Sequence, residues 1–162
     1  MEEAARILVL SDSHKDMAAL QKAVARETPD AIIHLGDHIL DALALGRAYP
    51  NIPLHAVRGN TDEASFGEAE IVVTLFGCKF LLTHGHRYHV KRDLAPLVYR
   101  AQELKVDVAL FGHTHRALIE PAAGLLLCNP GCCNRRLSAY GPPSYLVLTM
   151  SGNKAYPRLV LE

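Results

Sequence analysis

The chain has 162 residues, and its 17 lysines and arginines are balanced by 17 aspartates and glutamates. This balance gives no general electrostatic attraction to nucleic acid or to an anionic membrane, so neither is expected as a partner. No apolar run approaches the roughly 20 residues of a membrane-spanning helix, and the acidic start over residues 1–6 is not a secretory signal. The four cysteines form no C-x-x-C pair, which is typical of reduced thiols and predicts a cytoplasmic protein. The length predicts one domain over residues 1–162. Exposed apolar segments are compatible with a homo-oligomer.

The first part of the chain alternates short apolar strands with helices. Residues 6–10, 31–35 and 54–57 are apolar runs of the kind that form buried strands. A helix is expected from Met17, with Asp16 as its N-terminal cap and Pro29 as its stop, and a second helix over residues 39–47. This alternation predicts parallel strands.

The pattern changes after residue 69. Strand pairs joined by short turns predict hairpins over residues 70–75 and 79–83, 117–120 and 125–128, and 145–150 and 155–161. A helix over residues 93–104, with Pro96 in its first turn, and a buried strand over residues 106–111 lie between the first two hairpins. Parallel and antiparallel strands together predict an α/β fold, a four-layer αββα sandwich of two mixed β-sheets flanked by helices.

Short polar motifs stand where these predicted strands give way to loops. They are Asp12-Ser13-His14, Gly36-Asp37, Gly59-Asn60, His84-Gly85-His86 and Gly112-His113-Thr114-His115. Open α/β sheets build their sites at the C-terminal ends of strands. In extended backbone, the two outer residues of an i, i+2 pair such as Asp12 and His14 point to the same side. Carboxylate and imidazole donors suit Mn²⁺, Fe²⁺, Zn²⁺, Ni²⁺ or Co²⁺, so the motifs predict a site for two adjacent divalent metals.

The order D-x-H, G-D, G-N-x-D, H-G-H, G-H-x-H resembles that of the calcineurin-like metallophosphoesterases. With Asn129-Pro130-Gly131 after the last motif, the chain is similar to the small YfcE-type phosphodiesterases of bacteria and archaea. The resemblance implies two divalent metal ions, Mn²⁺ first among the candidates, and a small phosphate-ester substrate that is hydrolysed in line by a metal-bridging hydroxide. It also implies two ligand sets that share a bridging carboxylate: Asp12, His14, Asp37 and His115 for one metal, and Asp37, Asn60, His84 and His113 for the other.

The third motif departs from the family pattern. Many relatives carry His after the Gly-Asn pair, where it can protonate the leaving group, but this chain has Thr61, whose hydroxyl does not titrate near neutrality. Diesters with good leaving groups are therefore the expected substrates. Asn60, Asp62 and His86 are the candidate catalytic residues. His86 or His38 could replace the missing acid, and Asp62 has the alternative role of a hydrogen-bond acceptor within its loop.

Several residues keep a structural reading beside the functional one. His34 and His55 lie inside strands and are expected to be structural, and Cys132 is expected to support the backbone of the site rather than to act as a nucleophile. The sequence leaves two roles open for Arg58, Arg135 and Arg136: contact with a phosphate group, or a position on the protein surface. The rival function is a non-catalytic scaffold on the same fold, as in the retromer subunit Vps29. A nuclease is not favoured, because there is no basic stripe and little aromatic surface for base stacking.

Overall fold

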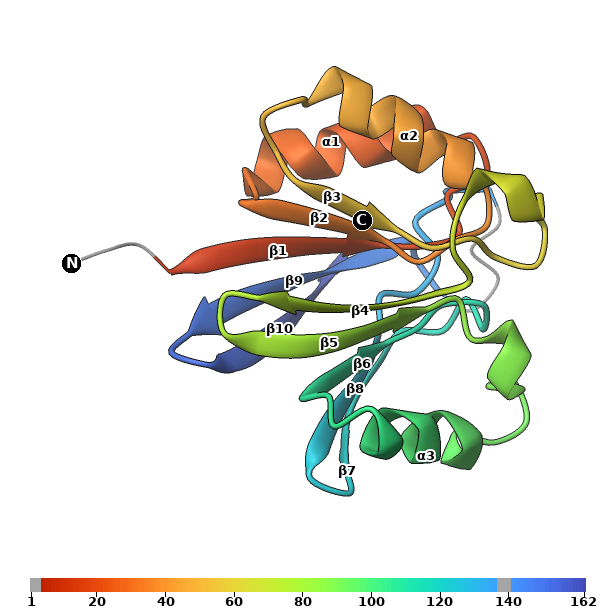
Figure 1. Cartoon of the computed structure of the whole chain (residues 1–162). Helices are drawn as coiled ribbons and strands as arrows, with labels where there is room; N and C mark the ends of the chain where they lie inside the picture. Colours follow the sequence, from red (N-terminus) through yellow and green to blue (C-terminus); the bar gives the residue numbers. More distant parts are fainter. Residues whose placement is uncertain (1–3, 137–140) are drawn as a thin grey trace.

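The structure is a computed structural model that describes residues 4–136 and 141–162 (Figure 1). One five-stranded sheet holds, in spatial order, β10 (Lys154–Leu161), β9 (Ser144–Ser151), β1 (Ala5–Leu10), β2 (Ala31–His34) and β3 (Leu54–Ala56). The other holds β4 (Glu70–Leu75), β5 (Cys78–Thr83), β6 (Val108–Leu110), β8 (Leu125–Asn129) and β7 (Leu118–Ala122). The helices are α1 (Met17–Glu27), α2 (Ile39–Ala48) and α3 (Ala95–Glu103), with 3₁₀ turns at η1 (Ala64–Phe66) and η2 (His86–Tyr88).

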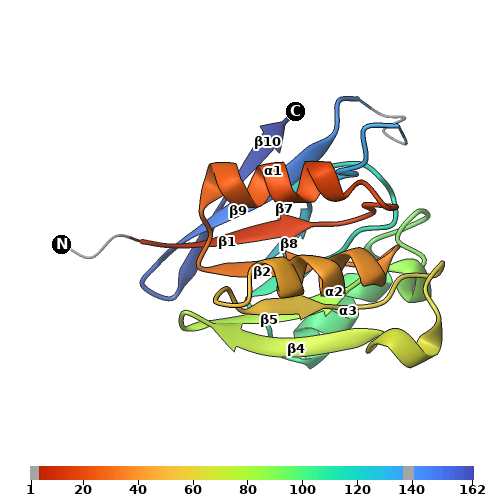
Figure 2. The ribbon, with the colours of Figure 1, turned by 90° about the horizontal axis from the view of Figure 1, so that it is seen from above.

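Both sheets are mixed, as the sequence predicted. In the first sheet, β1 pairs in parallel with β2 and β2 with β3, whereas β9 and β10 are antiparallel to their neighbours. In the second, β5, β6 and β8 run parallel, and β4 and β7 are antiparallel edge strands. Figure 1 shows α1 and α2 on the outer face of the first sheet and α3 on the outer face of the second. From above, α1 lies over β1 and α2 over β2 and β3 (Figure 2).

The side chains of β1 show how the layers are held together. Successive residues of a strand point to opposite faces, so Ile7 and Val9 enter the core between the two sheets, while Leu8 and Leu10 pack under the helices. All four are fully buried. A strand that is apolar on both faces is required here because the sheet is covered on both sides. A separate cluster joins the second sheet to α3.

The predicted helices and strands are all present, and their ends differ from the predicted ones by at most two residues. Asp16 caps α1 as predicted, because its side chain accepts a hydrogen bond from the backbone N–H of Ala19. Residues 1–3 of the acidic start lie outside the described residues. Within the described ranges, the longest helix is far too short to cross a bilayer. The loops that follow β1, β2, β5 and β6 gather at one end of the sandwich, on the right in Figure 1.

Candidate metal centre

The loops that carry the candidate ligands have left-handed backbone. Positive φ angles occur at Asp12 (57°), His14 (43°), Asp37 (59°), His113 (69°) and His115 (60°). Residues other than glycine rarely adopt this region, and such strain concentrates at functional sites. The extended backbone that the sequence predicted for the i, i+2 pairs is therefore wrong. Tight left-handed turns bring these side chains together instead.

Two glycines allow the loops to approach one another. A Cβ atom on Gly59 would lie 2.1 Å from Oδ1 of Asp37, and one on Gly112 would lie 2.1 Å from Oγ of Ser11. No side chain fits at such distances, so glycine is required at both positions. The Gly-Asn and Gly-His motifs thus supply both a donor and the close backbone approach that places it.

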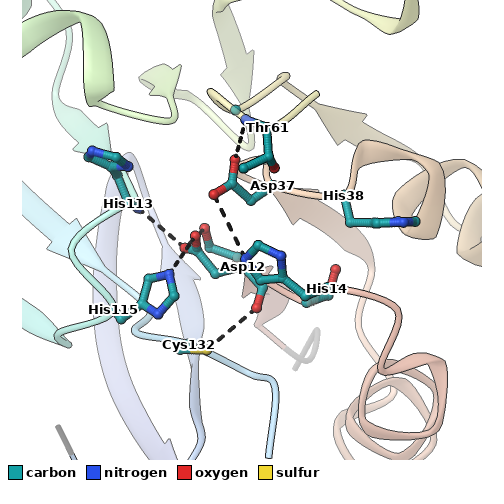
Figure 3. Close-up of polar contacts among 12 residues, drawn as sticks. Asp12, His14, Asp37, His38, Thr61, His113, His115 and Cys132 are labelled. Carbon is teal, nitrogen blue, oxygen red and sulfur yellow. Dashed lines mark hydrogen bonds and ion pairs between the residues drawn. The ribbon is translucent and has the colours of Figure 1, made fainter. Parts of the chain in front are cut away.

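The structure gathers six of the predicted ligands into two groups. Asp12, His14 and His115 form one group, and Asp37, His84 and His113 form the other, with the donor atoms of each group within 4.8 Å of one another. In Figure 3, His113 and His115 stand on one side of Asp12 and His14 on the other. Each group therefore combines one carboxylate with two imidazoles, a donor set that suits a transition-metal dication.

Asp12 keeps one carboxylate oxygen free. Its Oδ2 accepts hydrogen bonds from the Ser11 hydroxyl at 2.6 Å and from the His113 backbone N–H at 3.3 Å. Its Oδ1 is buried without a hydrogen-bond partner among the described residues and lies 3.2 Å from Nε2 of His115. Burial opposes ionisation, but the contact with His115 keeps the pKa of Asp12 below its ordinary value. An ionised, buried oxygen that makes no hydrogen bond and faces an imidazole nitrogen is what a metal ligand requires.

Asp37 belongs to the second group and also lies close to His14 of the first. Its Oδ2 is 3.3 Å from Nε2 of His84 and 3.8 Å from Nε2 of His14, while its Oδ1 accepts a hydrogen bond from the Thr61 backbone N–H at 3.2 Å. Burial raises the pKa of Asp37, but the close contact with the His84 ring outweighs it and holds the pKa well below the ordinary value. Asp37 is thus ionised and near both groups.

His84 is oriented by the backbone of β2. Its ring is fully buried, and Nδ1 donates a hydrogen bond to the Leu35 carbonyl at 2.7 Å. Because a carbonyl only accepts, the proton is fixed on Nδ1, and the Nε2 lone pair faces the group, where it has no hydrogen-bond partner among the described residues. Nε2 of His14 is likewise buried and unpaired. These orphaned atoms fit a bound cation.

The imidazoles differ in their affinity for protons. The Asp12 carboxylate, 3.2 Å from Nε2 of His115, raises the pKa of His115 to about 10. The pKa of His84 is raised as well: burial opposes this, but the close contact with the Asp37 carboxylate and the charge of Asp12 prevail. Burial, together with the charge of His84, lowers the pKa of His113 to about 4. The Asp12 and Asp37 carboxylates therefore attract positive charge to the positions that cations would take.

The remaining candidates lie around these groups in different ways. Asn60 is exposed, and its amide makes no hydrogen bond within the described ranges. Both oxygens of Asp62 accept hydrogen bonds from backbone N–H groups, those of Asp37, His38, Ile39 and Gly59, at 2.8 to 3.0 Å. Asp62 thus holds two ligand loops together and caps α2, which favours its alternative role over a catalytic one.

His86 and His38 occupy different surroundings. The His86 ring lies 5.5 Å from that of His84 and 6.0 Å from that of His113, and its buried Nδ1 has no hydrogen-bond partner in the described part of the chain. His38 turns toward α2, where its Nδ1 lies 3.0 Å from Oδ1 of Asp41. Of the two substitutes for the missing acid, only His86 faces the ligand groups.

Some supporting residues were missed in the sequence. Asn129 donates to the Gly112 carbonyl and to the Thr114 hydroxyl, both at 3.0 Å, and accepts from the Gly131 N–H, so it fixes the loop of His113 and His115. The Asn-Pro-Gly motif was the feature of the sequence that could have indicated this role of Asn129. The Cys132 thiol donates to the Asp12 carbonyl at 3.5 Å, which is the predicted backbone support (Figure 3). The expected structural role of His34 is also seen, since its buried Nδ1 accepts from the Gly36 N–H.

Comparison with known proteins identifies the family. Residues 5–153 match the calcineurin-like phosphoesterase superfamily domain. The probable metallophosphoesterase YsnB of Bacillus subtilis is 36% identical over 94% of this chain and 88% of its own length. Phosphodiesterase MJ0936 of Methanocaldococcus jannaschii is 28% identical over 97% of this chain and 99% of its own. The chain therefore belongs to the calcineurin-like phosphoesterase superfamily and is a metal-dependent phosphoesterase, which confirms the resemblance in the sequence.

Solved structures confirm the fold. A protein from Streptococcus pneumoniae TIGR4, described as a predicted phosphoesterase, matches with a TM-score of 0.83 and 25% identity over 99% of this chain and 91% of that one. Vps29 proteins also share the fold. The αββα prediction is therefore correct, and the fold by itself does not separate an enzyme from a scaffold.

Proposed function

We propose that this protein is a phosphodiesterase with a binuclear metal centre. One divalent ion would be held by Asp12, His14, Asp37 and His115, and the other by Asp37, Asn60, His84 and His113. The observation that carries the proposal is the position of Asp37 Oδ2, within 4 Å of an imidazole nitrogen from each donor group. A carboxylate in that place can bridge two ions.

The residues of the site have separable tasks. Bound cations supply Lewis-acid activation of water and charge stabilisation at phosphorus. Asp12 and Asp37 provide negative charge that is already ionised, and the Leu35 carbonyl fixes the tautomer of His84. Asn60, exposed at the edge of the centre, would turn its amide toward a phosphoryl oxygen once substrate is bound. Mn²⁺ is the expected native metal, although availability decides among metals that these donors accept.

The preference for diesters with good leaving groups is supported by Thr61 and by a neighbouring cavity. Thr61 is exposed and brings no titrating group to the site. A cavity of about 660 Å³, the apolar cavity, opens at His113 and His115; Val90, Leu94, Phe111 and Leu118 form an apolar part of its wall, and Lys91 and Arg116 also line it. An aryl ester group fits such a wall, and its phenolate departs without a strong acid. Where a proton is needed, His86 is the group in position to give it.

The scaffold alternative is weaker on structural grounds. A scaffold has no use for a buried carboxylate oxygen and buried imidazole nitrogens without partners, since each costs free energy when left unpaired. In this chain the donors of both groups are present and oriented. The free, buried cysteines agree with the proposed cytoplasmic location. The single domain over residues 1–162 and the assembly into a homo-oligomer remain predictions.

Hydrolysis of bis(p-nitrophenyl) phosphate tests the proposed function. The Mn²⁺-loaded protein should release p-nitrophenolate, and a chelator should abolish the reaction. Asp37→Asn should lose turnover. Asp107→Asn is the matched control, because the exposed Asp107 carboxylate accepts a hydrogen bond from the Lys79 backbone N–H. A metal-loaded protein that hydrolyses no diester would favour the scaffold.

The proposed role of His86 needs a separate measurement. Aryl diesters with leaving groups of graded pKa should show a steeper dependence of kcat on that pKa in His86→Ala than in the parent protein. His38→Ala should leave the slope unchanged, since its ring faces Asp41. Equal slopes in the parent protein and His86→Ala would remove His86 as the acid.

A further inference from the structure

A second cavity adjoins the metal centre on the side of His14. It has a volume of about 660 Å³ and is lined by His14, Lys15, Asp16, Asn134, Arg135 and Arg136. His14 is the residue that it shares with the donor groups, whereas the apolar cavity shares His113 and His115. The centre is thus flanked by two cavities of different chemistry: the first has an apolar part beside Lys91 and Arg116, and the lining of the second is polar or charged throughout.

The cationic cavity is built by two loops that are far apart in the sequence. The buried side chain of Asn134 donates to the Ser13 carbonyl at 2.8 Å and to the His14 carbonyl at 3.2 Å, and its Oδ1 accepts from the Arg136 backbone N–H at 2.8 Å. One amide therefore ties the turn that carries Arg136 to the loop that carries the metal ligands. The cavity is a feature of the fold rather than a chance gap between surface side chains.

Lys15 is held through its backbone by the buried carboxylate of Asp41. Its backbone has a φ angle of 71°, and its N–H donates to Oδ2 of Asp41 at 2.7 Å. The same oxygen accepts from the Ser13 hydroxyl at 2.8 Å, and Asp41 is buried in α2. The left-handed turn at Lys15, which follows the one at His14, is thus fixed from the interior.

The charges of the cavity do not cancel. Arg135 is engaged with Asp16, which it contacts through its backbone N–H, Nε and Nη2 at 3.2 to 3.3 Å. Lys15 and Arg136 are exposed, and in residues 4–136 and 141–162 neither side chain has a hydrogen bond or an ion pair. Two cationic side chains are therefore left to face an anion beside His14.

We propose that this cavity binds a second phosphate group of the substrate, so that the preferred substrate is a phosphodiester in which one alcohol also carries a phosphate monoester. The inference rests on the proposed function, because it places the diester phosphorus at the metal centre. A guanidinium fork and a flexible ammonium together match a tetrahedral dianion better than a neutral sugar or base. The other ester group is then directed to the apolar cavity at His113.

A matched pair of chromogenic esters tests the proposal. One is the p-nitrophenyl ester of thymidine 5′-phosphate, and the other is the same ester with an added 3′-phosphate. The Mn²⁺-loaded protein should hydrolyse the second with a kcat/KM at least about tenfold higher, the size of one charge-assisted contact to phosphate. The preference should fall by about tenfold in Lys15→Gln or Arg136→Gln, and should also fall as ionic strength rises.

Lys154→Gln is the control variant, because Lys154 is exposed on the hairpin between β9 and β10, at the opposite end of the sheet from the site. It should keep the preference of the parent protein. Metal content is measured for each variant, so that a lost ion is not mistaken for a lost anion contact. A parent protein with equal kcat/KM for both esters, or a preference that survives both substitutions, would overturn the proposal.

Calorimetric titration separates this proposal from the proposed function. Thymidine 3′,5′-bisphosphate should bind more tightly than thymidine 5′-phosphate, and the difference should shrink in Lys15→Gln and Arg136→Gln. If neither ester is hydrolysed but this difference is found, the subsite stands and the hydrolase proposal fails. If the esters are hydrolysed but both nucleotides bind alike, the hydrolase proposal stands and the subsite fails.

Discussion

Replacing Asp62 by alanine should loosen the metal centre without touching a metal ligand. The Asp62 carboxylate accepts hydrogen bonds from four backbone N–H groups, three at the start of α2 and one at Gly59. Asp62 is half-buried, so water recovers part of each lost bond, and about 0.5–1 kcal/mol remains for each. The sum is about 2–4 kcal/mol, of which loss of the helix cap contributes about 1 kcal/mol.

Urea unfolding of the metal-free protein measures this change, and Mn²⁺ titration measures its effect on the centre. Asp62→Ala should unfold at a lower urea concentration and bind Mn²⁺ more weakly, because the backbone N–H of Asp37, the proposed bridging residue, is one of the four hydrogen-bond donors. Asp107→Ala is the matched control, since its carboxylate accepts one backbone hydrogen bond, from Lys79, and it should cost less than about 1 kcal/mol. A loss below about 0.5 kcal/mol in Asp62→Ala would show that the four contacts do not hold the loops together.

Further predictions concern the core and the loops. Glu27 is buried and accepts from the Tyr145 hydroxyl and from Arg158; burial opposes its ionisation, but these bonds lower its pKa below 4.5. Its stabilisation is thus present above pH 4.5 and lost as the pH falls through the lowered value. Glu27→Gln should lose about 2 kcal/mol at pH 7, and its stability should converge with that of the parent protein as the pH falls through the lowered pKa of Glu27, as measured by denaturant unfolding; a pH-independent gap would contradict this. Gly112→Ala should lower the melting temperature and weaken Mn²⁺ binding, because the added Cβ displaces the Ser11 hydroxyl from Asp12; unchanged binding would show that the loop adapts. Asn129→Ala should cost more free energy of Mn²⁺ binding than free energy of unfolding, since it releases the Gly112 loop.

The layered fold was predictable because its causes are local. The apolar run of β1 and the 3.6-residue spacing of Met17, Leu20 and Val24 in α1 each reflect burial that periodicity reports directly. The donor motifs were predictable for a related reason, because they follow strands whose ends meet at one edge.

The loop geometry was not predictable in the same way. Left-handed backbone at Asp12 and His14 is imposed by contacts with other loops, such as the Gly36 carbonyl that accepts from the Asp12 N–H. The same applies to Asn134, whose amide reaches carbonyls about 120 residues earlier in the chain. No periodicity reports such a contact, so the cationic cavity appears only in the folded structure.

The number of Mn²⁺ ions bound per chain tests the proposed binuclear centre most directly. Equilibrium dialysis followed by elemental analysis should find two ions on the parent protein. Asp37→Asn should retain fewer, because its carboxylate lies within reach of both donor groups. A single bound ion on the parent protein, or two ions retained by Asp37→Asn, would contradict a centre bridged by Asp37.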